Sequence, residues 1–166
     1  MRLSNRHKSG IYNFVNTLMY VILASGVLIF LYERYKHDFL GAESYLLLVI
    51  PVLLILLFNF RGKHIFEYDS DGEALNFKNR NFVQLISKPI NDEFPKYKLK
   101  KYEVVNGLFF RRLYITIISK KEHHIILKYD ISYLTNKEVG DLKHSLSKVV
   151  KENKEKRESQ QTITNE

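Results

Sequence analysis

Residues 44–60 read SYLLLVIPVLLILLFNF and contain no charged side chain. A helix rises about 1.5 Å per residue, so about 20 apolar residues cross the hydrocarbon core of a bilayer. The stretch is at the short end of that range. Its apolar residues cover every face of a helix, however, and a buried helix of a soluble protein does not need this. We therefore predict a membrane span, with Pro51 tolerated as a kink.

A second uncharged stretch, residues 9–32, precedes the first, and residues 11–32 carry most of its apolar side chains. A cleaved signal peptide is the alternative interpretation, because the chain begins with basic residues. The apolar part is longer than that of most signal peptides, and Ile22-Leu23-Ala24 is a poor cleavage site. We predict an uncleaved span over 11–32, a second span over 44–60, and an antiparallel hairpin made by the short connection between them.

The distribution of charged residues predicts on which side of the membrane the two ends of this hairpin lie. Arg2, Arg6 and Lys8 precede the first span without any acidic residue, and Arg61 and Lys63 follow the second. The connection between the spans mixes two basic with three acidic residues. By the positive-inside rule we expect both termini in the cytoplasm and the connection on the outer side of the plasma membrane.

Composition excludes some classes of protein. The chain has 166 residues, no cysteine and a net charge of +8. Without thiols there is no disulfide framework, no thiolate zinc site and no cysteine nucleophile. The organisation that we predict is a basic flank over 1–10, the hairpin over 11–60, a cytoplasmic domain over 61–152 and a polar, disordered tail over 153–166.

The cytoplasmic domain begins with strand patterns. Residues 65–68 and 74–77 are strand-like, and Asp69-Ser70-Asp71-Gly72 between them has the composition of a turn. This is no EF-hand, because the glycine is fourth rather than sixth and Arg80 stands where the glutamate belongs. A third strand is expected over 82–86, followed by a loop bracketed by Pro89 and Pro95.

Asn106-Gly107 lies between two further strand patterns and predicts a two-residue type I′ turn. In that register Val104 faces Phe109, Tyr102 faces Arg111 with a cation–π contact, and Lys101 faces Arg112. The like-charged pair is unfavourable, so we expect a bulge near Lys100 and Lys101. Leu113, Ile115 and Ile117 then share one strand face, and Ile125, Leu127 and Tyr129 share the next. The sheet should be antiparallel.

The last element is predicted to be a helix. Thr135-Asn136-Lys137-Glu138 is a capping box, and an apolar stripe follows it at helical spacing. The members of that stripe are Val139, Leu142, Leu146, Val149 and Val150. The stripe needs a surface to cover, and the sheet offers one.

Strands followed by one capped helix resemble the pleckstrin-homology-like (PH-like) fold. More narrowly, the chain is similar to small bacterial membrane proteins in which a transmembrane hairpin precedes a cytoplasmic PH-like domain. FEYDSDGEALNFKN and YDISYLTNKEVGDLKHSL carry the resemblance, which covers 61–152 and the hairpin. The family has seven strands where we expect six, and residues 91–99 can hold the seventh. The resemblance implies α+β architecture, an antiparallel sheet or barrel capped by the helix, and an interaction module rather than an enzyme. It brings no lipid-binding motif with it.

No motif for catalysis or cofactor binding stands out in the sequence. His123 and His124 point to opposite faces of a strand, so they do not form a metal site. Walker, HExxH, GxSxG and kinase signatures are missing. We therefore expect no enzyme activity, no cofactor and no small-molecule substrate. Membrane tethering argues against nucleic acid as a partner.

Basic side chains are the remaining functional candidates. Arg61 and Lys63 follow the second span directly, and Arg111 and Arg112 form a pair further along. These four are our candidate membrane-surface contacts, although cytoplasmic flanks of spans are ordinarily basic. The predicted function is a membrane-anchored, non-catalytic binding module for a protein partner or lipid headgroups. The alternative is a structural accessory subunit that associates through its hairpin, with other chains or with its own copies.

Overall fold

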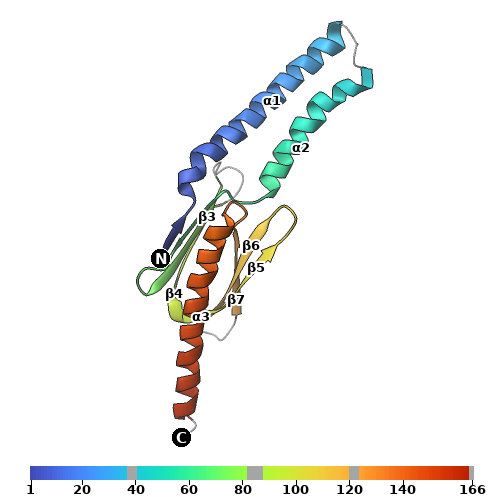
Figure 1. Cartoon of the computed structure of the whole chain (residues 1–166). Coiled ribbons are helices and arrows are strands. Elements are labelled where there is room, and N and C mark those ends of the chain that lie inside the picture. The colour runs from blue at the N-terminus through green and yellow to red at the C-terminus, as the bar shows by residue number, and fades with distance from the viewer. Residues whose placement is uncertain (37–40, 82–87, 120–123, 165–166) are drawn as a thin grey trace. The chain divides into compact units, whose positions relative to one another are not determined.

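The computed structural model describes residues 1–36, 41–81, 88–119 and 124–164 (Figure 1). The chain forms two compact units. One consists of the apolar helices, Lys8–Arg61, and the other joins Met1–His7 to Gly62–Glu166. We call the first the helical unit and the second the domain.

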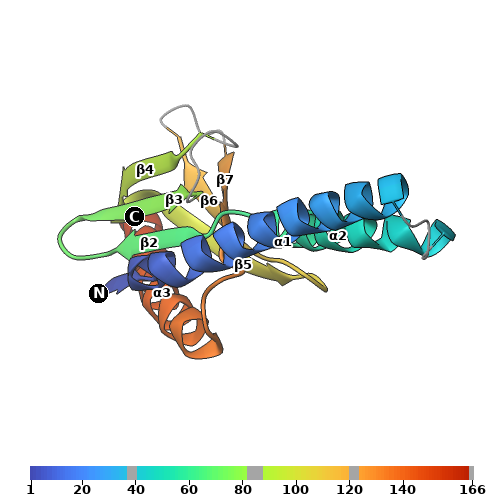
Figure 2. The same ribbon diagram turned by 90° about the horizontal axis from the view of Figure 1, so that it is seen from above.

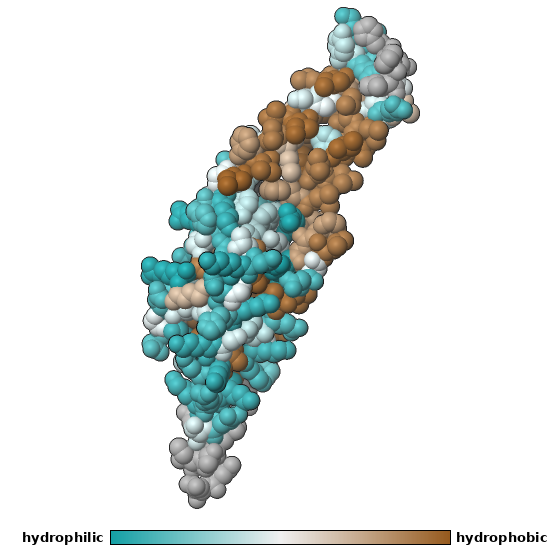
Figure 3. All heavy atoms as spheres, viewed as in Figure 1, coloured by the Kyte–Doolittle hydropathy of each residue, from teal (hydrophilic) through white to brown (hydrophobic). Residues whose placement is uncertain are grey.

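The helical unit contains α1 (Ser9–Lys36) and α2 (Leu46–Phe60), with a short 3₁₀ turn at Gly41–Tyr45 between them. Another 3₁₀ turn, Arg6–Lys8, leads from the domain into α1. The helices run antiparallel, since Gly26 of α1 lies against Leu47 while the Phe30 ring lies 5.5 Å from that of Tyr45. Both segments are long and apolar enough to cross a membrane. Figure 3 shows hydrophobic side chains covering them.

Gly26 is the close-approach point of this pair. It is buried, and a side chain there would collide with the carbonyl oxygen of Leu47 and contact the Pro51 ring. Glycine lets two helix backbones approach, which is the usual way in which spans associate. Ser25 beside it donates instead to the Val21 carbonyl within its own helix.

The first sheet of the domain has the strand order β1-β2-β3-β4, all antiparallel. Its strands are β1 (Arg2–Ser4), β2 (Ile65–Asp69), β3 (Ala74–Arg80) and β4 (Ile90–Pro95). Figure 2 shows β2, β3 and β4 side by side. The predicted turn joins β2 to β3, with Gly72 at φ +77° and the Asp69 carboxylate accepting from the Asp71 backbone N–H.

The strand β1 lies in the segment that we assigned to a basic flank. Leu3 pairs with Tyr68 in register and is buried in the core. Three residues are too few for an alternating pattern to be recognised, and both apolar helices separate them from their partner strand. The domain therefore begins before the first helix.

The second sheet contains β5 (Leu99–Asn106), β6 (Arg111–Ile118) and β7 (His124–Asp130), again antiparallel, with a 3₁₀ turn at Lys96–Lys98 before it. The predicted bulge is present between Leu99 and Lys101. The predicted inward faces of β6 and β7 are confirmed where Leu113 pairs with Tyr129 and Ile115 with Leu127. Ile125, at the start of β7, pairs with Ile117 but is exposed.

Two predictions about the strands are not confirmed, one for the Asn106-Gly107 turn and one for a strand over 82–86. The Asn-Gly turn is wrong: Asn106 pairs with Arg111, and residues 107–110 form a four-residue loop closed by the Gly107 N–H and the Phe110 carbonyl, 2.8 Å apart. Gly107 does not take the positive φ that a type I′ turn requires. Tyr102 and Lys101 consequently face Ile115 and Thr116 rather than arginines. The strand expected over 82–86 lies outside the described residues, while β4 occupies the region where we placed the seventh strand.

The helix α3 (Asn136–Thr164) packs on the sheets. Its capping box is confirmed, because Glu138 accepts from the Thr135 backbone N–H and the Thr135 hydroxyl accepts from the Glu138 N–H. The predicted stripe is buried in the core, with Val150 partly buried. Aromatic rings fill the space between sheets: Phe77 stacks on Tyr129 at 4.8 Å and on Phe94 at 5.6 Å.

The helix also runs further than expected. Residues 153–164 are helical where we expected a disordered tail. Asn153 donates to the carbonyls of Lys96 and Leu99, and Arg157 to those of Tyr97 and Leu99. These contacts tie two further helical turns to the start of β5.

We predict that Leu3→Ala lowers the free energy of unfolding of the domain by about 2 to 5 kcal/mol, because it removes a buried side chain. The matched control is Arg2→Ala on the same strand, whose largely exposed ion pair with Asp69 contributes at most about 1 kcal/mol. Urea unfolding of the full chain in mild detergent, followed by near-ultraviolet circular dichroism, measures both. Equal effects of the two substitutions would contradict the packing of β1.

We predict that Gly26→Val separates α1 from α2, because the new methyl groups meet the Leu47 carbonyl. The chain has no cysteine, so Phe30→Cys and Tyr45→Cys can be joined by a short bifunctional thiol reagent to report helix proximity. The cross-linking yield should fall with Gly26→Val. It should stay unchanged with Gly10→Val, where nothing lies within 4 Å of the added side chain.

Candidate functional site

The carboxylate of Asp130 organises the point where the chain enters the domain after α2. Gly62, at φ +92°, packs directly against this carboxylate and leaves no room for a side chain. The carboxylate accepts from the backbone N–H of Lys63 and from Nε of Arg112, each at 3.3 Å. We call Gly62, Lys63, Arg112 and Asp130 the Asp130 junction.

Buried asparagines hold the junction in place. Asn79 is fully buried; its amide donates to the carbonyls of Ile65 and Asp130, and its oxygen accepts from the Asp130 N–H. Asn5 is equally buried and binds both the His64 carbonyl and the Phe66 N–H at 2.8 Å. The segments that lead into α1 and out of α2 are therefore bonded to each other at one end of the domain.

The structure brings only two of the four predicted basic residues together. Lys63 and Arg112 meet at Asp130, and the Lys63 ammonium donates to the Lys88 carbonyl. Arg61 caps α2 and belongs to the helical unit. Sequence reasoning identified these residues but missed Asp130, which accepts from the Lys63 backbone N–H and from the Arg112 side chain, since nothing in the sequence marks that aspartate.

Arg111 occupies a different environment from its neighbour. Its guanidinium donates to the side-chain oxygens of Asn106 and Asn136, at 2.9 and 3.0 Å. Arg112 instead lies 4.3 Å above the Phe110 ring. The cation–π contact thus involves Arg112 and Phe110 rather than Arg111 and Tyr102. Both of these acceptors are neutral amide oxygens, so the guanidinium of Arg111 is held at this end of the sheet without a carboxylate in either hydrogen bond.

Burial shifts the pKa of two groups beside the junction. Desolvation lowers the pKa of His64, which packs 4.8 Å from the Tyr133 ring, and a hydrogen bond with Asn81 opposes the shift. Desolvation also lowers the pKa of Lys63, against the attraction of Asp130 and Asp92. Both effects follow from enclosing a charge in a poorly solvated corner of the domain.

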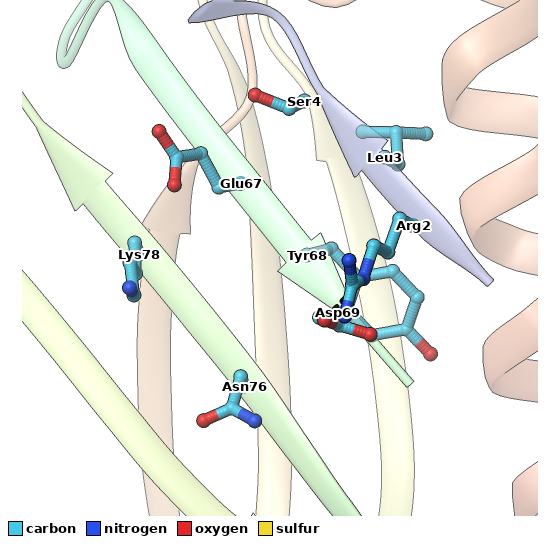
Figure 4. Close-up of a pocket in the computed structure, with 8 residues that line it drawn as sticks. All are labelled: Arg2, Leu3, Ser4, Glu67, Tyr68, Asp69, Asn76 and Lys78. Carbon is cyan, nitrogen blue, oxygen red and sulfur yellow. Dashed lines mark hydrogen bonds and ion pairs between the residues drawn. The ribbon is translucent and has the colours of Figure 1, made fainter. Parts of the chain in front are cut away.

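A second feature is an open depression of about 390 Å³ on β1, β2 and β3 (Figure 4). The pairing of these strands arranges polar side chains in two rows, Ser4-Glu67-Lys78 and Arg2-Asp69-Asn76. Charges of both signs alternate within it, and Arg2 bonds Asp69 at 2.8 Å. The Asp71 backbone N–H, then Arg2, lowers the pKa of the Asp69 carboxyl. This surface suits polar contacts rather than an apolar ligand.

Chemically reactive groups are scarce in the parts of the chain that the structure covers. No group of three or more metal-ligating side chains occurs among the described residues. His124 contacts the Lys100 ammonium at 3.0 Å, while His123 lies outside the described residues. The Tyr129 hydroxyl donates to Asp92 at 2.7 Å, and burial, followed by this carboxylate, raises the pKa of Tyr129.

Comparison with protein-family models, with curated proteins and with solved structures gives no match. Function is therefore argued from these surfaces and from the way the two units are connected.

We predict that acid destabilises the domain through His64. Its pKa is lowered in the folded state, so below about pH 6.5 the unfolded chain binds a proton that the folded chain resists. Stability should fall as the pH drops from about 7.5 to about 5.5. His64→Phe keeps a ring against Tyr133 and should flatten this decline in urea unfolding. His144→Gln, at an exposed position of α3, should leave the decline unchanged.

Proposed function

We propose that the chain is a membrane-anchored binding module, in which the helical hairpin holds a PH-like domain at the cytoplasmic face of the inner membrane. The domain contacts a protein partner or lipid headgroups and catalyses no reaction. The observation that carries this proposal is the pairing of β1 with β2. These strands flank the two apolar helices in the chain and yet belong to one sheet.

The pairing supports the topology. Two strands of one sheet must lie on the same side of a bilayer, and an antiparallel pair of spanning helices returns the chain to the side from which it started. Both segments that enter the helices are basic, with Arg2, Arg6 and Lys8 on one and Arg61 and Lys63 on the other. The positive-inside rule then favours the cytoplasm for the domain.

The strand arrangement supports the PH-like assignment. The sheets have four and three strands, and one long helix packs against the core that they share. With β1 included, seven strands are described, which is the number that the family has. A fold alone assigns no ligand, so the binding role rests on the anchoring and on the polar depression across β1, β2 and β3.

One observation favours the alternative role, an accessory subunit that associates through its hairpin. Asn13 and Thr17 are four residues apart on α1, and both are exposed. Polar side chains on the open face of a span form hydrogen bonds with neighbouring spans, including those of a second copy. Gly26, in contrast, is already used between α1 and α2.

Single-cysteine variants of the cysteine-free chain test both roles. We choose Lys78→Cys on the sheet face, Glu43→Cys in the connection between helices, and Leu28→Cys on the open face of α1. A membrane-impermeant maleimide applied to intact spheroplasts should label Glu43→Cys only. Labelling of Lys78→Cys under these conditions would refute the cytoplasmic placement.

The same variants then carry a thiol-linked photo-crosslinker inside the cell. A binding module should give a discrete adduct, with a protein or with lipid, from Lys78→Cys. Protein adducts from Leu28→Cys, with no adduct from Lys78→Cys, would overturn the binding-module proposal in favour of the accessory subunit.

A further inference from the structure

The tip of the β5–β6 hairpin, residues 107–110, exposes large apolar side chains. Leu108 is 89% exposed, more than any other large apolar side chain in the described part of the domain, and Phe109 is 56% exposed. A solvated loop ordinarily carries polar residues. We propose that Leu108 and Phe109 insert into the headgroup region of an anionic bilayer, so that the domain rests on the membrane through a third contact. This inference rests on the proposed membrane anchoring.

The conformation of the tip is fixed by contacts within the loop. The Gly107 N–H closes it on the Phe110 carbonyl, and the Phe110 ring fills the space where a Gly107 side chain would be. The guanidinium of Arg112 lies over the Phe110 ring, and Arg111 bonds Asn106 across the base of the loop. Phe110 is thereby held back while Leu108 and Phe109 remain outside.

The contacts of the domain itself place this tip at the attached end. Arg112 is the second residue of β6 and the second residue after the tip, and it lies opposite Asp130 in register. The same Asp130 carboxylate packs on Gly62 and binds the Lys63 N–H. Gly62 follows α2 after a single residue, so the base of the tip and the exit from the second apolar helix share one carboxylate.

The reach of the tip fits the interfacial layer. Phe109 and Leu108 precede Arg112 by three and four residues, so the tip extends at most about 10 to 13 Å beyond Arg112, at about 3.3 Å per residue. The headgroup regions on the two sides of a bilayer add about 10 to 15 Å in total to its hydrocarbon core. A short hairpin at the attached end can therefore place two side chains among headgroups without crossing the membrane.

Charge specifies the lipid. Arg111 and Arg112 begin β6 at the base of the tip. Arg112 and the backbone N–H of Lys63 bind the Asp130 carboxylate, whereas Arg111 bonds the side-chain oxygens of Asn106 and Asn136. Basic side chains close to a leaflet are attracted to anionic headgroups within about a Debye length, roughly 10 Å. Other exposed apolar residues are placed differently: Ile125 and Ile126 lie at the opposite end of β7 from Asp130.

The chain has no tryptophan, so Phe109→Trp introduces a single fluorescent reporter at an exposed position. The full chain is reconstituted in nanodiscs of phosphatidylglycerol and phosphatidylcholine, with brominated acyl chains as the quencher. We expect a blue-shifted emission and quenching by the brominated lipid. Emission that responds only to aqueous iodide would overturn the proposal.

Two matched variants make each outcome decisive. Tyr97→Trp is also exposed. It lies in the 3₁₀ turn before the first residue of β5, at the end of that strand away from the tip, and it should not be quenched by lipid. Leu28→Trp, on the open face of α1, should be quenched strongly. If Leu28→Trp is quenched and Phe109→Trp is not, the tip contact fails while the anchoring stands; if neither is quenched, the anchoring fails as well. Phosphatidylcholine alone should weaken quenching of Phe109→Trp, and equal quenching would refute the preference for anionic lipid.

Discussion

The antiparallel pairing of β1 with β2 joins two parts of the chain that both apolar helices separate. Leu3 completes the core beside Tyr68, and the backbone and side chain of Asn5 both bond Phe66. Without this strand, β2 would become an exposed edge, with unpaired backbone groups along it. A fragment that starts at Arg61 lacks the strand, so it is not equivalent to the domain. The helical unit is, in this sense, an insertion between the first and second strands of a sheet.

Closing so long an insertion has an entropic cost that grows only slowly with its length. The helical unit reduces this entropic cost further, because its antiparallel helices bring the end of the insertion back beside its start. The close approach at Gly26 and the hydrogen bonds of Asn5 with residues on either side of Ile65 act at separate points along this closed path. The Gly26 contact lies within the helical unit, and the Asn5 hydrogen bonds lie within the domain.

Features with a local signal were predictable from the sequence. Each of these features can be recognised from neighbouring residues alone: the apolar stretches, the Asp69–Gly72 turn composition, the Thr135 capping box and the stripe of α3. The β1 strand could not be found, because three residues carry no period and their partner is more than sixty residues away. The Asn-Gly signal misled, because Arg111 recruits the Asn106 side chain and moves the turn beyond it. For the candidate site, the cations were visible as charges, whereas Asp130 and the buried asparagines acquire their roles only through contacts across the fold.

Because β1 precedes both apolar helices, folding of the domain depends on how these helices are inserted in the proposed topology. During synthesis β1 leaves the ribosome first, and it cannot pair until both helices and then β2 have been made. If the helices span a membrane as proposed, a chain in which only one of them crossed it would leave β1 and β2 on opposite sides, with the place of Leu3 in the core unfilled. Such a molecule would show an open sheet edge to the proteases and chaperones that recognise unfolded protein. In the proposed topology, only a chain whose hairpin has inserted correctly can form the folded domain.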